Sequence, residues 1–385
     1  MRRLTVFVTL SAVASLTLLA CVSDDSSPIV GSTEYEDGSP DAVIPPQGEA
    51  GPDATIADGG NDANPSTDAG DGAVAPLVCS DAGTGLCLIV LAASQANPEG
   101  AVVHDGFLYW IEEGLPGRIQ RIPVAGGPAQ QLATGQQDSF ALTLDDTSLY
   151  WADEYTGTVY SAPLTGVPAG GSPTLLATVD GGSPNTLVVD SSRVYWTDFN
   201  AGKIYAAPLG GGTPTVLASG QSVPSDIAND GTNLYWTNDV VNGSVMALSL
   251  TDGGAPFAIV PSANLPTRLQ VTNGTVYFIT NSANVVYAAP TTGITDGGAP
   301  TVLVTTGSDT STDPSVVETV SFAFDGTTVF WATSGNPTGQ IRSAIPGGPA
   351  TTLALGMTSP FGVTFDTTNV YWTNTAFGAV LEMAK

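Results

Sequence analysis

An aliphatic-aromatic-aromatic triplet recurs seven times along the chain, and this repeat restricts the fold more than any other feature. The third residues of the copies are Trp110, Trp151, Trp196, Trp236, Phe278, Trp331 and Trp372. Successive copies lie 41, 45, 40, 42, 53 and 41 residues apart. A period of about 40–45 residues made of short strands is typical of a β-propeller, with one blade per repeat. We therefore predict an all-β, seven-bladed β-propeller.

The unit 183–219 shows what one repeat encodes. Four short runs rich in apolar and β-branched residues predict four strands, at Pro184–Val189, Val194–Thr197, Lys203–Pro208 and Thr215–Ala218. Asp, Ser, Asn and Gly residues between these runs predict turns. Each blade is thus expected to be a four-stranded antiparallel meander. Because one meander cannot bury both of its faces, we expect the recurrent Trp and Tyr residues to fill the space between blades.

The sequence also predicts how the ring closes. The seventh repeat supplies three strands, while Leu88–Ser94 upstream of the first repeat resembles the fourth-strand pattern. We expect this N-terminal strand to complete the last blade and to remove its open edge. Cys79 and Cys87 lie just before this strand, and we expect a disulfide between them, as in exported proteins. Two free thiols are the alternative.

Residues 1–21 have the features of a processing signal. Two arginines precede an apolar stretch, and Leu18-Leu19-Ala20-Cys21 resembles the bacterial lipoprotein signal, in which the cysteine becomes the lipidated N-terminus. An ordinary secretory signal is the alternative. No other segment is long and apolar enough to span a membrane. We expect an exported cell-envelope lipoprotein at the outer membrane or cell surface, anchored through lipidated Cys21, with the leaflet left open.

Charge and composition divide the remaining chain into a tether and a propeller. Between Val22 and Leu86 there are 13 acidic residues and no Lys or Arg, so residues 22–78 are expected to be a disordered tether. The propeller is expected over residues 79–385. From Cys87 onward 23 acidic and 7 basic residues remain, a difference of −16. Such a surface repels nucleic acid and anionic lipid, so we expect a monomer whose partner is a protein or small molecule.

Residues suited to catalysis are scarce. The chain has one histidine, His104, and no Gly-Xaa-Ser-Xaa-Gly nucleophile elbow. Aspartates recur just before the predicted second strands, and recurrence in every blade predicts a role in turns. They are Asp105, Asp145, Asp190, Asp230, Asp325 and Asp366, and Asn273 takes this place in the fifth repeat. The sequence contains no EF-hand-like loop, so we expect no cofactor, with bound calcium as the alternative.

A unique site should lie where the blades differ from one another. The starts of the predicted inner strands differ in this way, and we call their distinctive side chains the ring residues. They are Glu99, Phe140, Asn185, Asp226, Arg268, Glu318 and Phe361. We expect them to surround one mouth of the central channel, overhung by an extra loop of the fifth repeat, Gly307–Val317. An ordinary hydrated channel is the alternative.

Two known families resemble parts of this sequence. The string from Tyr195 to Asp198 and its near copies resemble the YWTD repeats of low-density-lipoprotein-receptor propellers, which implies a protein-binding module. Glu99-Gly100 with Leu108–Trp110 and Gly117–Ile119 resembles the opening of the gluconolactonase (senescence-marker) family. That resemblance implies a divalent metal held by Glu99, Asn185 and Asp226. We expect a binding or scaffold module without catalysis; the alternative is a metal-dependent, lactonase-like hydrolase.

Overall fold

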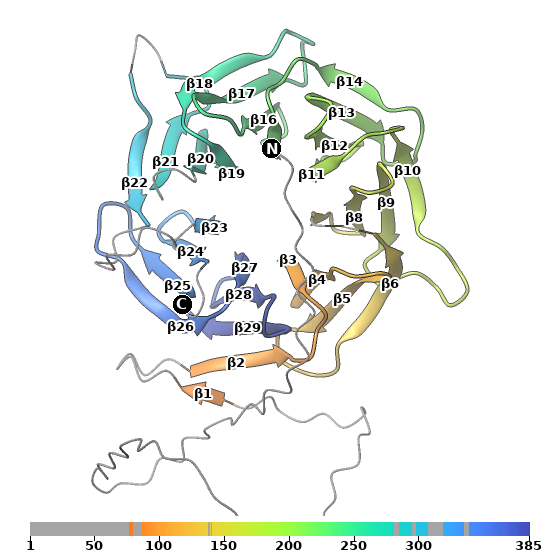
Figure 1. Cartoon of the computed structure of the whole chain (residues 1–385), viewed down its shortest axis with the longest axis vertical. Coiled ribbons are helices and arrows are strands. Elements are labelled where there is room, and N and C mark those ends of the chain that lie inside the picture. Colours follow the sequence, from red (N-terminus) through yellow and green to blue (C-terminus); the bar gives the residue numbers. More distant parts are fainter. Residues whose placement is uncertain are drawn as a thin grey trace, which may run out of the picture. The chain divides into compact units, whose positions relative to one another are not determined.

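The computed structural model describes residues 77–79, 87–137, 139, 141–280, 285–294, 298–306, 319–334 and 339–385. In this part of the chain, β-strands form seven antiparallel sheets arranged around one axis (Figure 1). The predicted seven-bladed propeller is therefore confirmed. No helix among the described residues has the length and apolarity needed to cross a membrane. The expected signal, the lipidation at Cys21, most of the tether and the loop 307–317 lie outside the described residues.

Each blade has an inner, a second, a third and an outer strand, and blade 1 begins with β3. The inner strands are β3 (Pro98–His104), β7 (Leu142–Leu144), β11 (Pro184–Val189), β15 (Pro224–Asn229), β19 (Pro266–Thr272), β23 (Thr319–Phe324) and β27 (Pro360–Phe365). The second strands are β4 (Phe107–Glu112), β8 (Ser148–Asp153), β12 (Arg193–Asp198), β16 (Asn233–Asn238), β20 (Thr275–Thr280), β24 (Val329–Thr333) and β28 (Asn369–Asn374).

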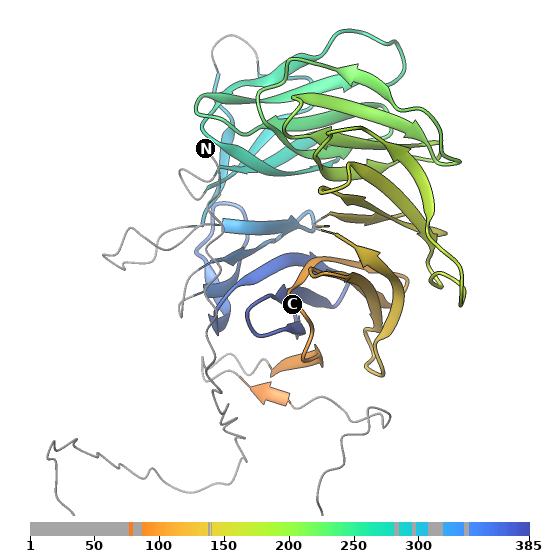
Figure 2. The same ribbon diagram turned by 45° about the vertical axis from the view of Figure 1, so that its right-hand side comes forward.

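The two remaining positions of each blade lie farther from the axis. The third strands are β5 (Gly117–Pro123), β9 (Thr158–Pro163), β13 (Lys203–Pro208), β17 (Gly243–Ser249), β21 (Val285–Pro290), β25 (Gly339–Ala344) and β29 (Ala379–Ala384). The outer strands are β6 (Gln130–Gln136), β10 (Thr174–Thr178), β14 (Thr215–Ala218), β18 (Phe257–Ala263), β22 (Thr301–Thr305), β26 (Thr351–Met357) and, in blade 7, β2 (Cys87–Ala92). The oblique view shows that each blade is a twisted sheet (Figure 2).

The four strands predicted in the unit 183–219 correspond to β11, β12, β13 and β14. They pair in sequence order, and Trp196 on β12 lies opposite Tyr205 on β13. The two rings stack with their centroids 5.4 Å apart. Local turn chemistry and strand pattern were therefore sufficient to define this blade.

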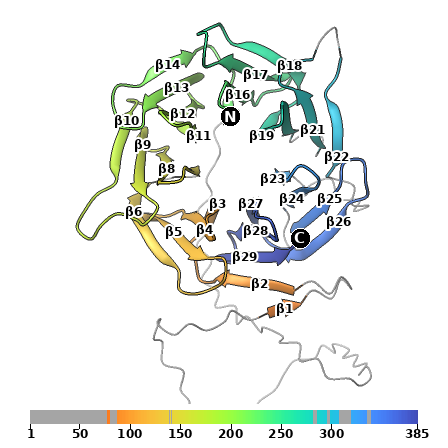
Figure 3. The same ribbon diagram turned by 180° about the vertical axis from the view of Figure 1, so that it is seen from behind.

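The N-terminal strand closes the ring as expected. β2 pairs antiparallel with β29, with Val90 opposite Leu381, and so supplies the fourth strand of blade 7 (Figure 3). One feature was not expected: β1 (Leu77–Cys79) pairs with the other edge of β2 and makes this sheet five-stranded. The edge of β2 has unpaired backbone groups, so an adjoining segment can satisfy them. Cys79 and Cys87 are register partners in this pairing, and the disulfide between them stays a prediction.

The recurrent aromatic residues form the core between blades. All six tryptophans are at most 1% exposed. In one cluster Tyr150 of blade 2 packs with Val194 and Trp196 of blade 3, which shows that the aromatic residues join neighbouring blades. The predicted packing role is confirmed. Replacing a buried tryptophan of this kind by alanine typically costs about 3–5 kcal/mol, so these positions stabilise the ring rather than distinguish one blade from another.

Candidate functional site

The repeat gives the propeller two different faces. We call the face where the inner strands begin the start face, and the face where they end the end face. Because successive strands are antiparallel, the turn between the second and third strand of each blade returns to the start face. Backbone hydrogen bonds confirm this placement: Phe199 N donates to Ser183 O at 3.1 Å, and Asp239 N donates to Val223 O at 2.9 Å. Both acceptors immediately precede inner strands.

Asp226 ties two neighbouring inner strands together at the start face. Its Oδ1 accepts from its neighbour Ile227 N at 3.0 Å, and its Oδ2 accepts from Leu269 N of blade 5 at 2.8 Å. Burial raises the pKa of Asp226, and the positive charge of Arg268 and these N–H bonds only partly oppose that rise. Both carboxylate oxygens of Asp226 therefore bind backbone N–H groups of the inner strands that surround the channel.

Arg268 is held by residues of two other blades. Its Nε donates to Val320 O of blade 6 at 3.3 Å, and its Cζ lies 5.2 Å from the centroid of the Phe361 ring in blade 7. A guanidinium over an aromatic face is attracted by the negative face of the ring. The structure thus brings together Arg268 and Phe361, two ring residues that are far apart in the sequence.

The other ring residues have different environments. Asn185 Nδ2 donates to Ser225 O at 3.4 Å, the carbonyl of the residue before Asp226. Glu99 lies on β3 in blade 1. Phe140 and Glu318 lie outside the described residues. Glu99, Asn185, Asp226, Arg268 and Phe361 each remain partly exposed although they lie on inner strands, so solvent reaches this part of the start face.

The turns between second and third strands, which we call the hairpin tips, carry exposed apolar side chains. Large hydrophobic residues at the tips of blades 1, 2, 3, 4 and 7 are 38% to 83% exposed. They are Leu115, Tyr155, Phe199, Val241 and Phe377. The tips of blades 5 and 6 lie at 281–284 and 335–338, outside the described residues. Every described hairpin tip therefore presents an apolar side chain on the start face.

The corresponding turns at the end face are polar. In blades 2, 3, 4 and 7 an aspartate accepts from the backbone of its turn with one oxygen and from a tyrosine hydroxyl with the other. The tyrosine bonds are Tyr150 to Asp145, Tyr195 to Asp190, Tyr235 to Asp230 and Tyr371 to Asp366, at 2.6–2.7 Å. The expected turn role is therefore confirmed for these aspartates.

These hydrogen bonds shift the pKa of both partners in each pair. Burial alone would raise the pKa of Asp190, but the bonds from Tyr195 and from the turn together outweigh burial and lower the pKa. Burial and the neighbouring carboxylate raise the pKa of Tyr235 to about 12. The hydrogen bonds stabilise turns that recur around the ring. The shifted pKa values therefore do not mark a single site.

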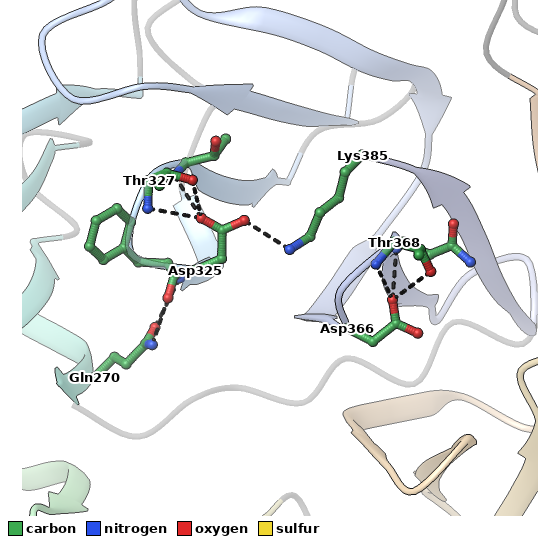
Figure 4. A network of polar contacts seen from close by, with 9 residues as sticks. Gln270, Asp325, Thr327, Asp366, Thr368 and Lys385 are labelled. Atoms are coloured by element: carbon green, nitrogen blue, oxygen red, sulfur yellow. Dashed lines mark hydrogen bonds and ion pairs between the residues drawn. The ribbon is translucent and has the colours of Figure 1, made fainter.

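Asp325 in blade 6 departs from this pattern because Phe330 occupies the tyrosine position. Its Oδ2 instead accepts from Lys385 Nζ at 2.8 Å, while its Oδ1 accepts from Thr327 (Figure 4). The ammonium group also lies 4.2 Å from the centroid of the Phe365 ring. The bonds from Lys385 and the turn overcome the effect of burial and hold the pKa of Asp325 well below its usual range.

A hollow of about 610 Å³ lies at the end face between blades 1, 6 and 7. Its lining includes Asp325, Asp366 and Lys385, together with His104, whose Nε2 is 3.7 Å from Asp146 Oδ1. Asp325 is already bonded to Lys385, and Asp366 to Tyr371 and its own turn. Asp325, Asp366 and Lys385 therefore take part in holding the turns beside this hollow.

Among the described residues, no group of three or more His, Cys, Asp and Glu side chains is arranged to hold a metal ion. The metal trio implied by the gluconolactonase resemblance, which is the alternative, contains an amide and comes from blades 1, 3 and 4, through Glu99, Asn185 and Asp226. It remains a prediction. His104 lies at the end of β3, away from the start of that strand where Glu99 lies.

Sequence reasoning missed the hairpin tips and the hollow at the end face. Asp, Asn, Gly and Thr dominate the tips, and this composition predicts turns without indicating an exposed apolar residue. A usable signal was present in the sequence: a large apolar residue interrupts the polar turn in blades 1, 2, 3, 4 and 7, as Phe199 does between Asp198 and Asn200. The hollow depends on which turns of three blades become neighbours, and that follows only from ring closure.

Comparison with known proteins identifies the fold and no family. No protein-family model matches the sequence, and neither does any curated protein. The structure is similar to virginiamycin B lyase from Staphylococcus aureus, with a TM-score of 0.61 and 15% identity over 78% of this chain and 99% of that chain. A streptogramin B lyase gives 0.62 and 14%, over 79% of this chain and 99% of that chain. A chain of a nidogen/laminin complex matches more weakly, with a TM-score of 0.43 and 20% identity over 72% of this chain and 88% of that chain.

Proposed function

We propose that this chain is a protein-binding module that uses the start face of its propeller. The observation that carries the proposal is the apolar residue at every described hairpin tip. A residue that recurs in each blade and is buried, as the tryptophans are, is explained by packing. The tip residues recur and are exposed, so packing within the chain does not account for them. Five of the eleven exposed large apolar side chains among the described residues lie at these tips, and exposed apolar groups that share one face occur at interaction surfaces.

The chemistry of this face favours a polypeptide partner over a lipid surface. Tyrosine, phenylalanine and leucine side chains at the tips resemble the apolar anchors of protein interfaces, where aromatic residues are enriched. The propeller carries 23 acidic and 7 basic residues, which repels anionic headgroups. Acidic residues such as Glu154 adjoin the tips. We therefore expect a partner with apolar side chains flanked by Lys or Arg.

A lyase or hydrolase activity has less support, although enzymes share the fold. One of the similar solved structures is a catalytically inactive virginiamycin B lyase in which a histidine is replaced by alanine. The single histidine of this chain, His104, ends β3 and lines the hollow at the end face.

A module at the cell envelope, exported and anchored through lipidated Cys21, agrees with the N-terminal signal and forms part of the proposal.

The proposal is tested by removing the tips without disturbing the core. A triple variant Leu115→Ser, Tyr155→Ser and Val241→Ser removes three exposed side chains. The control is Ile345→Ser, which removes a 61% exposed residue from a turn at the opposite face. Proteins captured from cell-envelope extract by the wild type are identified, purified and measured against each variant. We expect the triple variant to lose at least about tenfold in affinity and the control to bind like the wild type.

Equal affinity of the triple variant and the wild type would rule out the start face as the binding surface. Flotation with neutral and anionic vesicles provides the second measurement. If the tips bind the vesicles, the partner of the start face is a membrane and not a protein. The hydrolase alternative is tested by ion content: a stoichiometric divalent ion that is lost in Glu99→Ala would favour the metal-dependent enzyme.

A further inference from the structure

Arg268 stands out because its guanidinium is fixed in place while part of its hydrogen-bonding capacity is unused. Val320 O accepts from Nε, and the Phe361 ring lies beside Cζ. Within the described part of the chain, neither Nη atom has a hydrogen-bond or ion-pair partner. A guanidinium already held by residues of two other blades loses little freedom when it binds an anion, and such pre-organisation favours affinity.

The nearest described carboxylate does not occupy these donors. Asp226 accepts from Ile227 N and Leu269 N, and its oxygens are not within ion-pair distance of Arg268. The negative charge of Asp226 still acts on Arg268 through space. Asp226 therefore faces a positive group whose Nη donors it does not bind. Among the described residues, no carboxylate takes up the Nη donors of Arg268, so an anion from outside the chain can bind them.

The free end of a guanidinium has a definite chemical preference. Two parallel N–H donors match the two oxygens of a carboxylate and form a bidentate pair. Phosphorylated or otherwise multiply charged ligands are disfavoured because the propeller has an excess of 16 negative charges. The Phe361 ring beside the guanidinium suits an apolar group next to the carboxylate. One carboxylate on a partly apolar ligand therefore fits this site best.

We propose that Arg268 binds a free carboxylate of the ligand, as presented by the C-terminal residue of a polypeptide. Arg268 supplies its two Nη groups to the carboxylate, and Phe361 contacts the apolar side chain next to it. This inference rests on the proposed binding function of the start face and specifies the chemical group that is recognised at its centre.

The test uses the full chain and two probes that differ in one group. The probes are acetyl-alanyl-alanyl-phenylalanine as the free acid and the same peptide as its C-terminal amide, titrated by calorimetry. We expect the acid to bind at least about tenfold tighter than the amide, because only the acid forms the charged bidentate pair. The preference should shrink as salt is added.

Substitutions assign the preference to Arg268. Arg268→Gln should remove the difference between acid and amide, and Arg268→Lys should keep part of it because the charge remains without the fork. Arg193→Gln is the control, since it removes the same charge from an exposed residue where β12 begins at the end face. Thermal unfolding of each variant shows whether it is folded. Propionate and acetylphenylalanine distinguish a small carboxylic acid from a peptide terminus.

Equal binding of acid and amide, or a preference that survives in Arg268→Gln, would overturn the inference. So would the absence of saturable binding of the acid up to roughly 10 mM, which is weaker than any useful recognition. Failure here is distinct from failure of the proposed function. If the hairpin-tip variant loses its partner while the acid shows no preference, the start face still binds protein and only the carboxylate contact is wrong.

Discussion

The guanidinium carbon of Arg268 lies 5.2 Å from the centroid of the Phe361 ring, which joins blade 5 to blade 7 across the start of blade 6. The two residues are partly exposed, so their attraction is expected to be worth about 0.5–1 kcal/mol. A double-mutant cycle with Arg268→Gln and Phe361→Leu should show a coupling of that size in urea unfolding. Additive effects within about 0.3 kcal/mol would mean that the contact contributes nothing to stability.

The hydroxyl of Tyr235 donates to Asp230 Oδ2 at 2.7 Å, and its removal should destabilise the protein. Tyr235→Phe is expected to lose about 1 kcal/mol at pH 7, since the acceptor is charged but partly exposed. The pKa of Tyr235 is raised to about 12 from 10.0, first by burial and then by Asp230. This stabilisation is complete below pH 10 and is lost as the pH rises toward 12.

Unfolding curves of the wild type and Tyr235→Phe between pH 7 and pH 12 measure this difference. The two curves should converge at high pH, because the ionised tyrosine can no longer donate to Asp230. A constant difference over the whole range would contradict the assigned hydrogen bond. Blade 6 offers an internal comparison, since Phe330 already occupies this position and Asp325 bonds to Lys385 instead.

Gly202 tests how the hairpin tips are held at the start face. Its φ is +62°, and an added Cβ would lie 2.4 Å from Gln221 O, whose own N–H donates to Gly202 O. Gly231 has a φ of +83° and open space around it, so it serves as a control. Gly231→Ala should cost about 1 kcal/mol from backbone strain alone. Gly202→Ala should cost about 1–3 kcal/mol more, because a backbone carbonyl must move.

The difference between the two glycine variants is measured by urea unfolding. Equal losses would mean that the connection near Gln221, between the outer strand of blade 3 and the inner strand of blade 4, moves without cost, and the tip would then be loosely attached. A larger loss in Gly202→Ala supports a rigid hairpin tip, as a binding surface requires.

The sequence was sufficient for the fold because each blade is specified locally. The strands β11 to β14 follow from apolar runs separated by turn residues, and the buried position of Trp196 follows from its recurrence. Closure by β2 was also predictable, because one strand was missing at the end of the repeat and one was spare at its beginning. All of these features depend on neighbours in sequence or on the repeat period.

The candidate site was less predictable because it depends on contacts between blades. The sequence indicated Asp226, Arg268 and Phe361 as breaks in the repeat. It did not show that both oxygens of Asp226 accept from backbone N–H groups while the Arg268 guanidinium contacts the Phe361 ring. Exposure of Tyr155 and Leu115 was equally hidden, since a turn pattern does not say whether its apolar residue folds back onto the blade.

Glu382 gives the sharpest dependence on pH. It lies on β29 between Tyr371 on β28 and Ile89 on β2, at the strand pairing that closes the ring. Its side chain is 6% exposed, and among the described residues its Oε2 has no hydrogen-bond partner. The corresponding residue of blade 3 is Ala206, opposite Tyr195. A carboxyl thus replaces a small apolar side chain in the one blade that the N-terminal strand completes.

Burial, followed by the charge of Asp366, raises the pKa of Glu382 to about 7 from 4.5. The neutral acid is therefore favoured in the folded protein, and stability should fall as the pH rises from 4.5 through 7. Glu382→Gln keeps the shape and removes the titration. Its melting temperature should resemble that of the wild type near pH 4.5 and exceed it at pH 8. The control Asp180→Asn changes an exposed residue, and its melting temperature should follow that of the wild type at both pH values. If the wild type melts at the same temperature as Glu382→Gln at pH 8, the buried carboxyl does not oppose closure of the ring.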